Sequence, residues 1–344
     1  MASNSSLKSF LLETKQPVFA VIDGAQFEDL PRKLFGGDFV HTPLYLDRGD
    51  GNRDRVLTAP QLVWLDRGRD RGSPVNTETR NPPDPDVVER LLELLGLAPA
   101  AVFWQCSAGG HALFRHLRTT NMILVPEDTE TDYGKPYEIS PLQTEGAMEG
   151  MSAPSNHVLV LFRHADANVM AQVLPTLNPA QVSRLLGPAE ALCFAADPQW
   201  NEAGGVMGAR RAPNLPERQA GMLKLEQENI RAISVRRDAA LTRKVAGYLE
   251  RVAPDRVSAL EEGKLQKFAQ YSLRESRRFG VETDAGHCRW AYMSLVTSGQ
   301  LGQNPSVQEA MRADAPGYSA DTRVALLMRH SFLAVKKQAS REVD

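Results

Sequence analysis

The feature that most constrains the fold is a change in hydrophobic pattern about two thirds of the way along the chain. Up to residue 197, short apolar and β-branched runs alternate with amphipathic stretches, whereas after Glu217 the apolar residues follow helical spacing. With 344 residues, the chain is long enough to bury more than one core. The pattern predicts an α/β N-terminal lobe with a mixed sheet, followed by an all-helical C-terminal lobe.

The same change of pattern gives the predicted domain boundaries. A linker is expected at 201–218, because this stretch is rich in Gly, Pro and Arg. It separates an α/β domain at 17–200 from a helical lobe at 219–344, and an N-terminal tail occupies 1–16.

Within the α/β domain, strands are predicted where β-branched and aromatic residues cluster, at 18–22, 43–46, 61–65, 101–106, 122–125, 157–162 and 190–195. Helices are predicted where apolar residues recur every three or four positions, at 25–35, 86–95, 111–119, 168–174 and 179–186. Two long polar stretches, 66–85 and 127–156, are expected to be loops. In the second lobe, helices are expected at 222–252, 256–279 and 284–296, from Pro305, and at 321–335.

Charge and composition favour a protein that works away from membranes and nucleic acid. The net charge is −2, and basic residues of the helical lobe alternate with acidic ones, which is not the basic stripe of a nucleic-acid binder. No apolar run approaches the roughly 20 residues that span a bilayer, and the N-terminus lacks the pattern of a signal peptide. Three separated cysteines, Cys106, Cys193 and Cys288, are expected to be buried thiols, so we predict a cytoplasmic protein.

Two short patterns invite a catalytic or zinc-binding interpretation, and neither is complete. Ser107 lies in QCSAGG, but Gln105 stands where a nucleophile elbow requires glycine. His111 and His116 are five residues apart, which places them on different faces of a helix rather than on the one face that a zinc pair needs.

Two further patterns suggest calcium or phosphate sites and also fail. Part of a calcium loop is suggested by Asp47, Asp50, Asn52 and Asp54. A calcium loop needs glycine at its sixth position and glutamate at its twelfth, and this chain has neither of them there. The glycines at 204–208 follow no predicted strand and open no clear helix. The sequence therefore predicts no catalytic residue, no cofactor and no metal.

Five phrases in the N-terminal lobe occur in an order that indicates a family. In chain order they are FAVIDGAQF (19–27), PLYL (43–46), FWQCSAGGHALFRHLR (103–118), VLVLFRHADANVM (158–170) and NPAQVSRLLGPAEAL (178–192). Together they resemble the effector chaperones, or adaptor proteins, of the bacterial type VI secretion system (the Tap/TEC family). The chain departs from the family at Ala165, where an aromatic residue is usual, and at Ala167-Asn168, where the family has proline and arginine.

The resemblance implies a binding function without catalysis. Members of this family are cytoplasmic, hold a toxic effector, and load it onto the VgrG spike. The implied partners here are therefore a cognate effector, bound through a segment laid in a cleft between the lobes, and VgrG. Two alternatives remain open: an α/β hydrolase with an unrecognised nucleophile such as Ser107, and a structural subunit without a client.

Candidate partner-binding residues come from the matched central phrases and from the helical lobe. They are Trp104, Arg115, Arg118, Arg163 and Tyr271. Each has a simpler alternative role: Trp104 lies on a strand that is expected to be buried, Arg163 can pair with Asp166, and Arg115 and Arg118 can form a solvated helix face.

Overall fold

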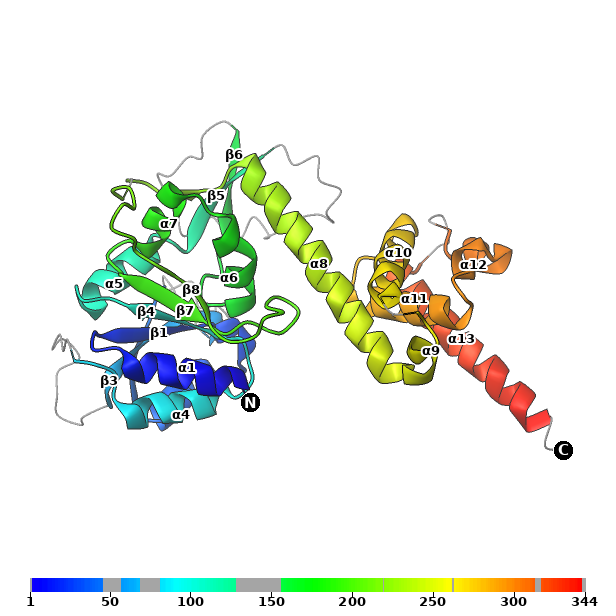
Figure 1. The fold of residues 1–344 in the computed structure, drawn as a ribbon, viewed down its shortest axis with the longest axis horizontal. Coiled ribbons are helices and arrows are strands. Elements are labelled where there is room, and N and C mark those ends of the chain that lie inside the picture. The colour runs from blue at the N-terminus through cyan, green and yellow to red at the C-terminus, as the bar shows by residue number, and fades with distance from the viewer. Residues whose placement is uncertain are drawn as a thin grey trace. The chain divides into compact units, whose positions relative to one another are not determined.

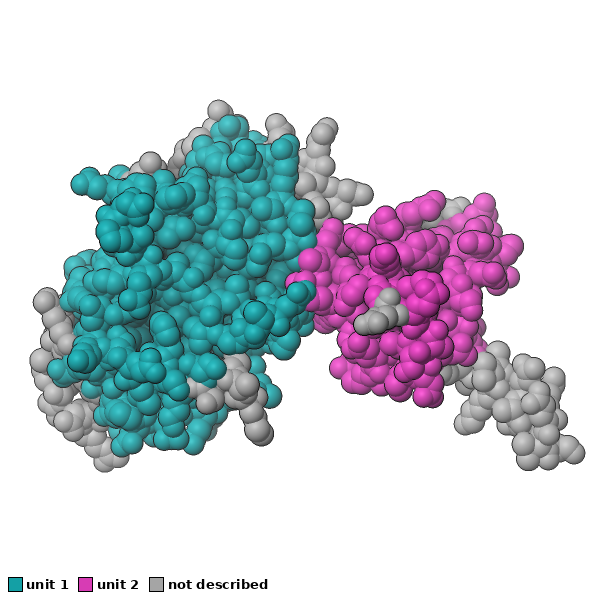
Figure 2. All heavy atoms as spheres, viewed as in Figure 1, with its two compact units in different colours: residues 1–236 teal, residues 237–344 magenta. Residues whose placement is uncertain are grey.

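The computed structural model describes residues 2–45, 57–68, 81–127, 156–218, 220–261, 263–312 and 317–341. The chain forms two compact units, Met1–Arg236 and Arg237–Asp344, called here the N-terminal and C-terminal units (Figure 2). The predicted class is confirmed, because the N-terminal unit combines sheets of mixed direction with helices and the C-terminal unit is helical (Figure 1). Among the described residues, no helix is both long enough and apolar enough to cross a membrane.

A six-stranded antiparallel sheet forms the centre of the N-terminal unit. Its strand order is β2-β3-β1-β4-β7-β8, with β1 at Val18–Ile22, β2 at Phe39–Pro43, β3 at Gln61–Gly68, β4 at Ala101–Gln105, β7 at Ala191–Phe194 and β8 at Met207–Arg210. A second sheet, in the order β6-β5-β9, contains β5 (Met122–Pro126), β6 (His157–Leu161) and β9 (Leu223–Lys224). Here β5 pairs antiparallel with β6 and parallel with β9, so this sheet is mixed.

Both faces of the central sheet are buried, which explains why its inner strands read as continuous apolar runs. Successive side chains of a strand point to opposite faces. On β1, Phe19 and Val21 therefore lie in one core, while Val18, Ala20 and Ile22 lie in the other. The central sheet is thus the middle layer of three.

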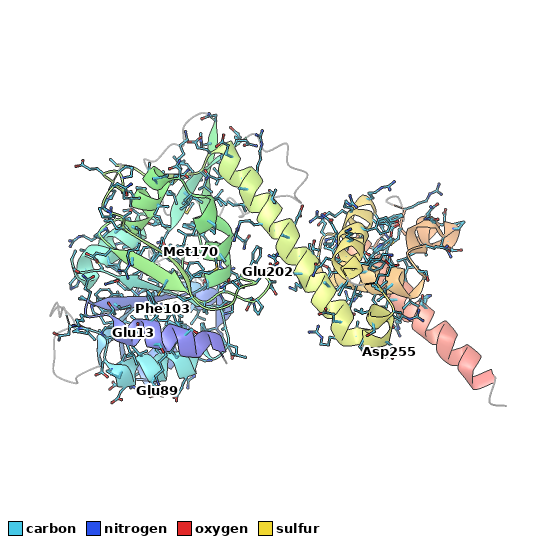
Figure 3. The ribbon with its side chains drawn as sticks, viewed as in Figure 1. Glu13, Glu89, Phe103, Met170, Glu202 and Asp255 are labelled. Carbon is cyan, nitrogen blue, oxygen red and sulfur yellow. The ribbon has the colours of Figure 1, made fainter. Side chains whose placement is uncertain are left out.

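Helices form the two outer layers. One face of the sheet is covered by α1 (Ala2–Glu13), α2 (Leu30–Gly36) and α4 (Pro85–Leu95), and the other by α5 (Gly110–Arg118), α6 (Ala167–Val173) and α7 (Pro179–Leu186). The short 3₁₀ turns η1 (Gly24–Gln26) and η3 (Leu174–Thr176) complete this unit. Phe103 and Met170, labelled in Figure 3, belong to the two cores on opposite faces.

The start of α4 follows the general rules of helix capping. The side chain of Asp84 accepts hydrogen bonds from the backbone N–H groups of Asp86 and Val87, and Pro85 opens the helix. Gly96 ends it with φ +58°. The buried face of α4 consists of Val87, Val88, Leu91, Leu92 and Leu95.

Several boundaries differ from the sequence prediction. The strand expected at 43–46 is β2 at Phe39–Pro43, and the helix expected at 25–35 is replaced by η1 and α2. The expected N-terminal tail contains α1, whose Leu7 and Leu11 are buried against the sheet because they lie one helical turn apart. The expected linker contributes β8, which pairs with β7. The two units divide not at 201–218 but within α8 (Gln227–Val252), which begins after β9 rather than at residue 222.

The C-terminal unit contains helices packed around two adjoining apolar clusters. Besides the second part of α8, it contains α9 (Pro254–Ser258), α10 (Lys264–Arg278), α11 (Asp284–Val296), η4 (Leu301–Gln303), α12 (Pro305–Ala310) and α13 (Ala320–Arg341). The single helix expected at 256–279 is interrupted between α9 and α10, where Gly263 adopts φ +75°. Trp290 of α11 is fully buried in one of the clusters.

Several sequence patterns cannot be compared with the structure. The failed calcium loop, with Asp47, Asp50, Asn52 and Asp54, lies outside the described residues. The same holds for most of the two expected loops at 66–85 and 127–156.

Candidate partner-binding surface

Helix α5 presents two arginines on its exposed face. It begins at Gly110, directly after Gly109, whose φ of +91° favours glycine. Leu113 and Leu117 are buried against the sheet. This leaves Arg115 and Arg118 exposed on the opposite side, which agrees both with partner binding and with a solvated helix face.

Neither of these two arginines forms an ion pair with any carboxylate of the described residues. The Arg118 guanidinium lies 5.6 Å from the centre of the Phe114 ring, one turn earlier on α5, which favours a defined position for this cation. Two exposed positive charges on one helix, without acidic partners, can therefore be offered to another molecule.

Helix α7 adds a third arginine, which is buried. The residue Arg184 is only 5% exposed. Its Nε donates to the Gly221 carbonyl at 2.5 Å, and its Nη2 donates to the Thr119 hydroxyl at 3.2 Å. Since Thr119 is the C-cap of α5, these bonds link Arg184 to the end of α5 that carries Arg115 and Arg118.

The segment after β8 brings two more arginines to this place. Arg211 donates through Nη2 to the Gly187 carbonyl at 2.7 Å, which holds the segment against the end of α7. Ser183 strengthens this attachment by donating to the Pro216 carbonyl at 2.6 Å. The exposed Arg218 follows on the same segment. We define the arginine surface as Arg115, Arg118, Arg184, Arg211 and Arg218.

The buried arginine of this surface has a lowered proton affinity. Burial lowers the pKa of Arg184, and the positive charge of Arg218 lowers it further. Like the two arginines of α5, Arg184, Arg211 and Arg218 pair with no carboxylate of the described residues. The arginine surface is thus a cluster of like charges that no carboxylate of the described residues compensates.

A neutral histidine joins α5 to α7 beneath this surface. The Nε2 of His116 donates to the Leu185 carbonyl at 2.8 Å. Burial lowers the pKa of His116 to about 4, and the charges of nearby arginines lower it as well. The hydrogen bond to Leu185 acts in the opposite direction. The imidazole is therefore uncharged at neutral pH and adds no charge to the surface.

A different part of the fold contains Arg163, which contacts two buried carboxylates. Its Nη2 donates to Asp23, which follows β1, and lies 3.2 Å from Asp166 Oδ2. Both carboxylates also cap local structure, since Asp23 accepts from the Ala25 backbone N–H and Asp166 accepts from the first turn of α6.

The two carboxylates of this cluster favour the charged form of Arg163, but the charge of Asp23 also helps to raise the pKa of Asp166. Although burial opposes the charged form, Asp23 and Asp166 together raise the pKa of Arg163. Burial raises the pKa of Asp166, partly offset by backbone hydrogen bonds and by Arg163. Arg163 therefore joins the end of β1 to the start of α6. The ion pair with Asp166, which is the simpler role considered for Arg163, is present, and Arg163 also bonds to Asp23.

The remaining two candidates also have structural roles. Trp104 is fully buried in the core between the sheet and α5, so it takes no part in an exposed surface. Tyr271 belongs to the C-terminal unit, where its hydroxyl donates to Glu275 at 3.2 Å and Trp290 donates to the other carboxylate oxygen at 3.0 Å. The negative charge of Glu275 is the main cause of a raised Tyr271 pKa.

The patterns that suggested catalysis or metal binding acquire no further support. The backbone N–H of Ser107 donates to Glu190 at 3.0 Å, and no histidine of the described residues hydrogen-bonds to Ser107. The described part of the chain contains no group of three histidine, cysteine or acidic side chains that could hold a metal ion. The three cysteines are buried and free, as predicted.

Comparison with known proteins gives no match: no family model, no curated protein and no solved structure is similar to this chain. The arginine surface therefore depends on geometry alone. Sequence reasoning found Arg115 and Arg118 but not the other three arginines. Arg211 was visible only as part of the Arg210-Arg211 pair after the glycines at 204–208.

Proposed function

We propose that the protein is a non-enzymatic adaptor that binds a type VI secretion effector in the cytoplasm and loads it onto the VgrG spike. The observation that carries the binding function is the arginine surface, which exposes positive charge without acidic partners among the described residues. The family assignment depends on the five phrases, and the structure adds that the first and fourth of them meet through Asp23 and Arg163.

The chemistry of the arginine surface favours a protein partner with an acidic segment. Arginine is enriched at protein interfaces, where its guanidinium recognises carboxylates through paired hydrogen bonds. Complementary charge also raises the rate of encounter and rejects partners of the wrong sign. An effector segment rich in Asp or Glu would match Arg115 and Arg118 on α5.

The hydrolase alternative gains no support at Ser107, the nucleophile that the sequence suggested for it. A serine nucleophile requires a base within hydrogen-bond reach, and Ser107 has no histidine in that position among the described residues. We therefore propose binding rather than turnover as the function of this unit. A structural subunit without a client would differ from an adaptor only in its partners. Identifying the proteins that copurify therefore distinguishes these two functions.

The proposal is tested by purifying the affinity-tagged full-length protein from its own host and identifying the proteins that copurify. We expect one secreted effector and VgrG, each enriched at least tenfold over a parallel purification from the untagged strain. Loss of both after the lysate is brought to 1 M salt would agree with an electrostatic interface. Recovery of neither protein at low salt would contradict the adaptor function and favour the structural subunit.

A further inference from the structure

The arginine surface contains a buried guanidinium, that of Arg184, which is not fully hydrogen-bonded within the described residues. Arg184 uses Nε and Nη2 for the Gly221 carbonyl and the Thr119 hydroxyl, but Nη1 has no partner among the described residues and is shielded from solvent. A buried donor without a partner costs free energy, and buried charged groups are normally paired. The position of Arg184 therefore calls for an acceptor supplied from outside the described residues.

A second guanidinium, that of Arg218, lies near Arg184. Arg218 stands between Pro216, whose carbonyl accepts a hydrogen bond from Ser183, and Gly221, whose carbonyl accepts one from Arg184. Arg218 lowers the pKa of both Arg184 and His116, so its charge is near both groups. Arg218 is exposed and forms no hydrogen bond or ion pair with the described residues. Two guanidinium groups without an acid between them repel each other, and an anion bound between them would reverse the sign of the interaction.

The third arginine of this segment has a different role. Arg211 donates through Nε, Nη1 and Nη2 to the Ala189 carbonyl, the Ser183 hydroxyl and the Gly187 carbonyl. Its hydrogen bonds hold the segment that carries Arg218 on α7. Arg211 thus contributes positive charge to the site and fixes its geometry, while the free donors belong to Arg184 and Arg218.

We propose that Arg184 and Arg218 form a site for a carboxylate of the partner protein. This inference depends on the proposed function and names the group that the adaptor recognises. A carboxylate has two acceptor oxygens, and guanidinium groups form short, charge-assisted bonds with them. Because Thr119 and Gly221 already fix the Arg184 fork, little conformational freedom is lost on binding.

The charge of the surrounding sequence favours a single carboxylate over a nucleic-acid backbone. Residues 1–236 contain 23 Lys and Arg and 29 Asp and Glu, so the N-terminal unit, which carries both arginines, is net acidic. A nucleic acid binds through many phosphate contacts over a broadly basic surface. A local pair of arginines in an acidic region suits one acidic side chain instead.

The test uses the purified full-length protein and two blocked, fluorescent peptides, one of six glutamates and one of six glutamines. Fluorescence anisotropy gives the affinity of each peptide for the wild type and for Arg184→Lys, Arg218→Gln and Arg231→Gln. Arg231 is the matched control, because it is also exposed on the N-terminal unit and forms no ion pair with the described residues.

We expect the glutamate peptide to bind the wild type at least tenfold more tightly than the glutamine peptide. Arg218→Gln should weaken it about tenfold, and Arg184→Lys should weaken it as well, because lysine keeps the charge but loses the fork. Arg231→Gln should change the affinity less than twofold. Since Arg218 makes no hydrogen bond within the described residues, its variant should remain folded even if Arg184→Lys does not.

Three outcomes would overturn the inference: equal affinity for the two peptides, no loss in Arg218→Gln, or an equal loss in Arg231→Gln. Inorganic phosphate is added in a separate arm at constant ionic strength. Phosphate binding that is lost in Arg218→Gln, without binding of the glutamate peptide, would assign the site to a free oxyanion and reject the carboxylate. Because no effector is used, this result is independent of the copurification that tests the adaptor function.

Discussion

Gly187→Ala is expected to destabilise the N-terminal unit by about 2–5 kcal/mol. Gly187 ends α7 with φ +57° and ψ −119°, a conformation that side chains rarely adopt. A Cβ at this position would also lie 2.4 Å from three atoms of the His116 ring. The expected loss of stability is the sum of a backbone strain of about 1–3 kcal/mol and a similar cost of overpacking.

The chain contains a matched control for the backbone strain in this prediction. Gly96 ends α4 with φ +58° and ψ −120°, but a Cβ there would meet no atom within 4 Å. Gly96→Ala should therefore cost only the strain of about 1–3 kcal/mol. Urea unfolding of the two variants, compared with the wild type, gives both losses for the same unit. Equal losses would show that His116 does not crowd Gly187.

Acidification from pH 6.5 towards pH 4 should unfold the N-terminal unit, because two of its histidines are buried in the neutral form. Burial lowers the pKa of His116 to about 4 and that of His164 to about 3, and the charge of His116 contributes to the latter shift. In the unfolded chain, both groups titrate near pH 6.5. Below that pH the unfolded state binds more protons than the folded state, so stability falls with pH.

The size of this effect follows from the linkage between protonation and folding. Each histidine removes about 1.4 kcal/mol for every pH unit between the unfolded and folded pKa values. Between pH 6.5 and 4.5, the pair would remove about 5 kcal/mol, comparable to the stability of many domains. Far-UV circular dichroism between pH 7 and 4 measures the midpoint of the transition.

His164→Gln provides the discriminating variant. The His164 Nε2 donates to Asn121 Oδ1 at 2.9 Å, and a glutamine amide can donate there without titrating. We expect the pH midpoint of acid unfolding to be lower in His164→Gln than in the wild type, once any difference in stability at neutral pH is taken into account. His111→Gln changes a half-exposed imidazole and should leave the midpoint unchanged. An unchanged midpoint in His164→Gln would contradict the assigned role of this histidine.

The layers of the N-terminal unit could be predicted from sequence where an element is long or fully buried. β1 and β4 are apolar on both faces, and α4 has a cap, a proline and a complete apolar face. In contrast, β8 and β9 contain only four and two residues, which is too few for a periodic pattern. The helix at α1 begins with a run of small polar residues that resembles a tail.

The candidate site was harder to predict, because sequence gives the type of a side chain but not its neighbours. Arg115 and Arg118 could be recognised, since both lie on the polar face of one amphipathic helix. Arg184 lies within α7, and its approach to Thr119 and Gly221 depends on how three separate segments pack. The bond between Arg163 and Asp23 likewise joins residues 140 positions apart.

The central claim, that the arginine surface binds a protein partner, is tested most directly by the affinity of the copurified effector for purified variants. Isothermal titration calorimetry would compare the wild type, the double reversal Arg115→Glu/Arg118→Glu, and the control Arg231→Glu, with circular dichroism confirming that each is folded. We predict that the double reversal weakens binding at least tenfold and that the control stays within threefold of the wild type. A folded double reversal that binds with the affinity of the wild type would contradict the claim.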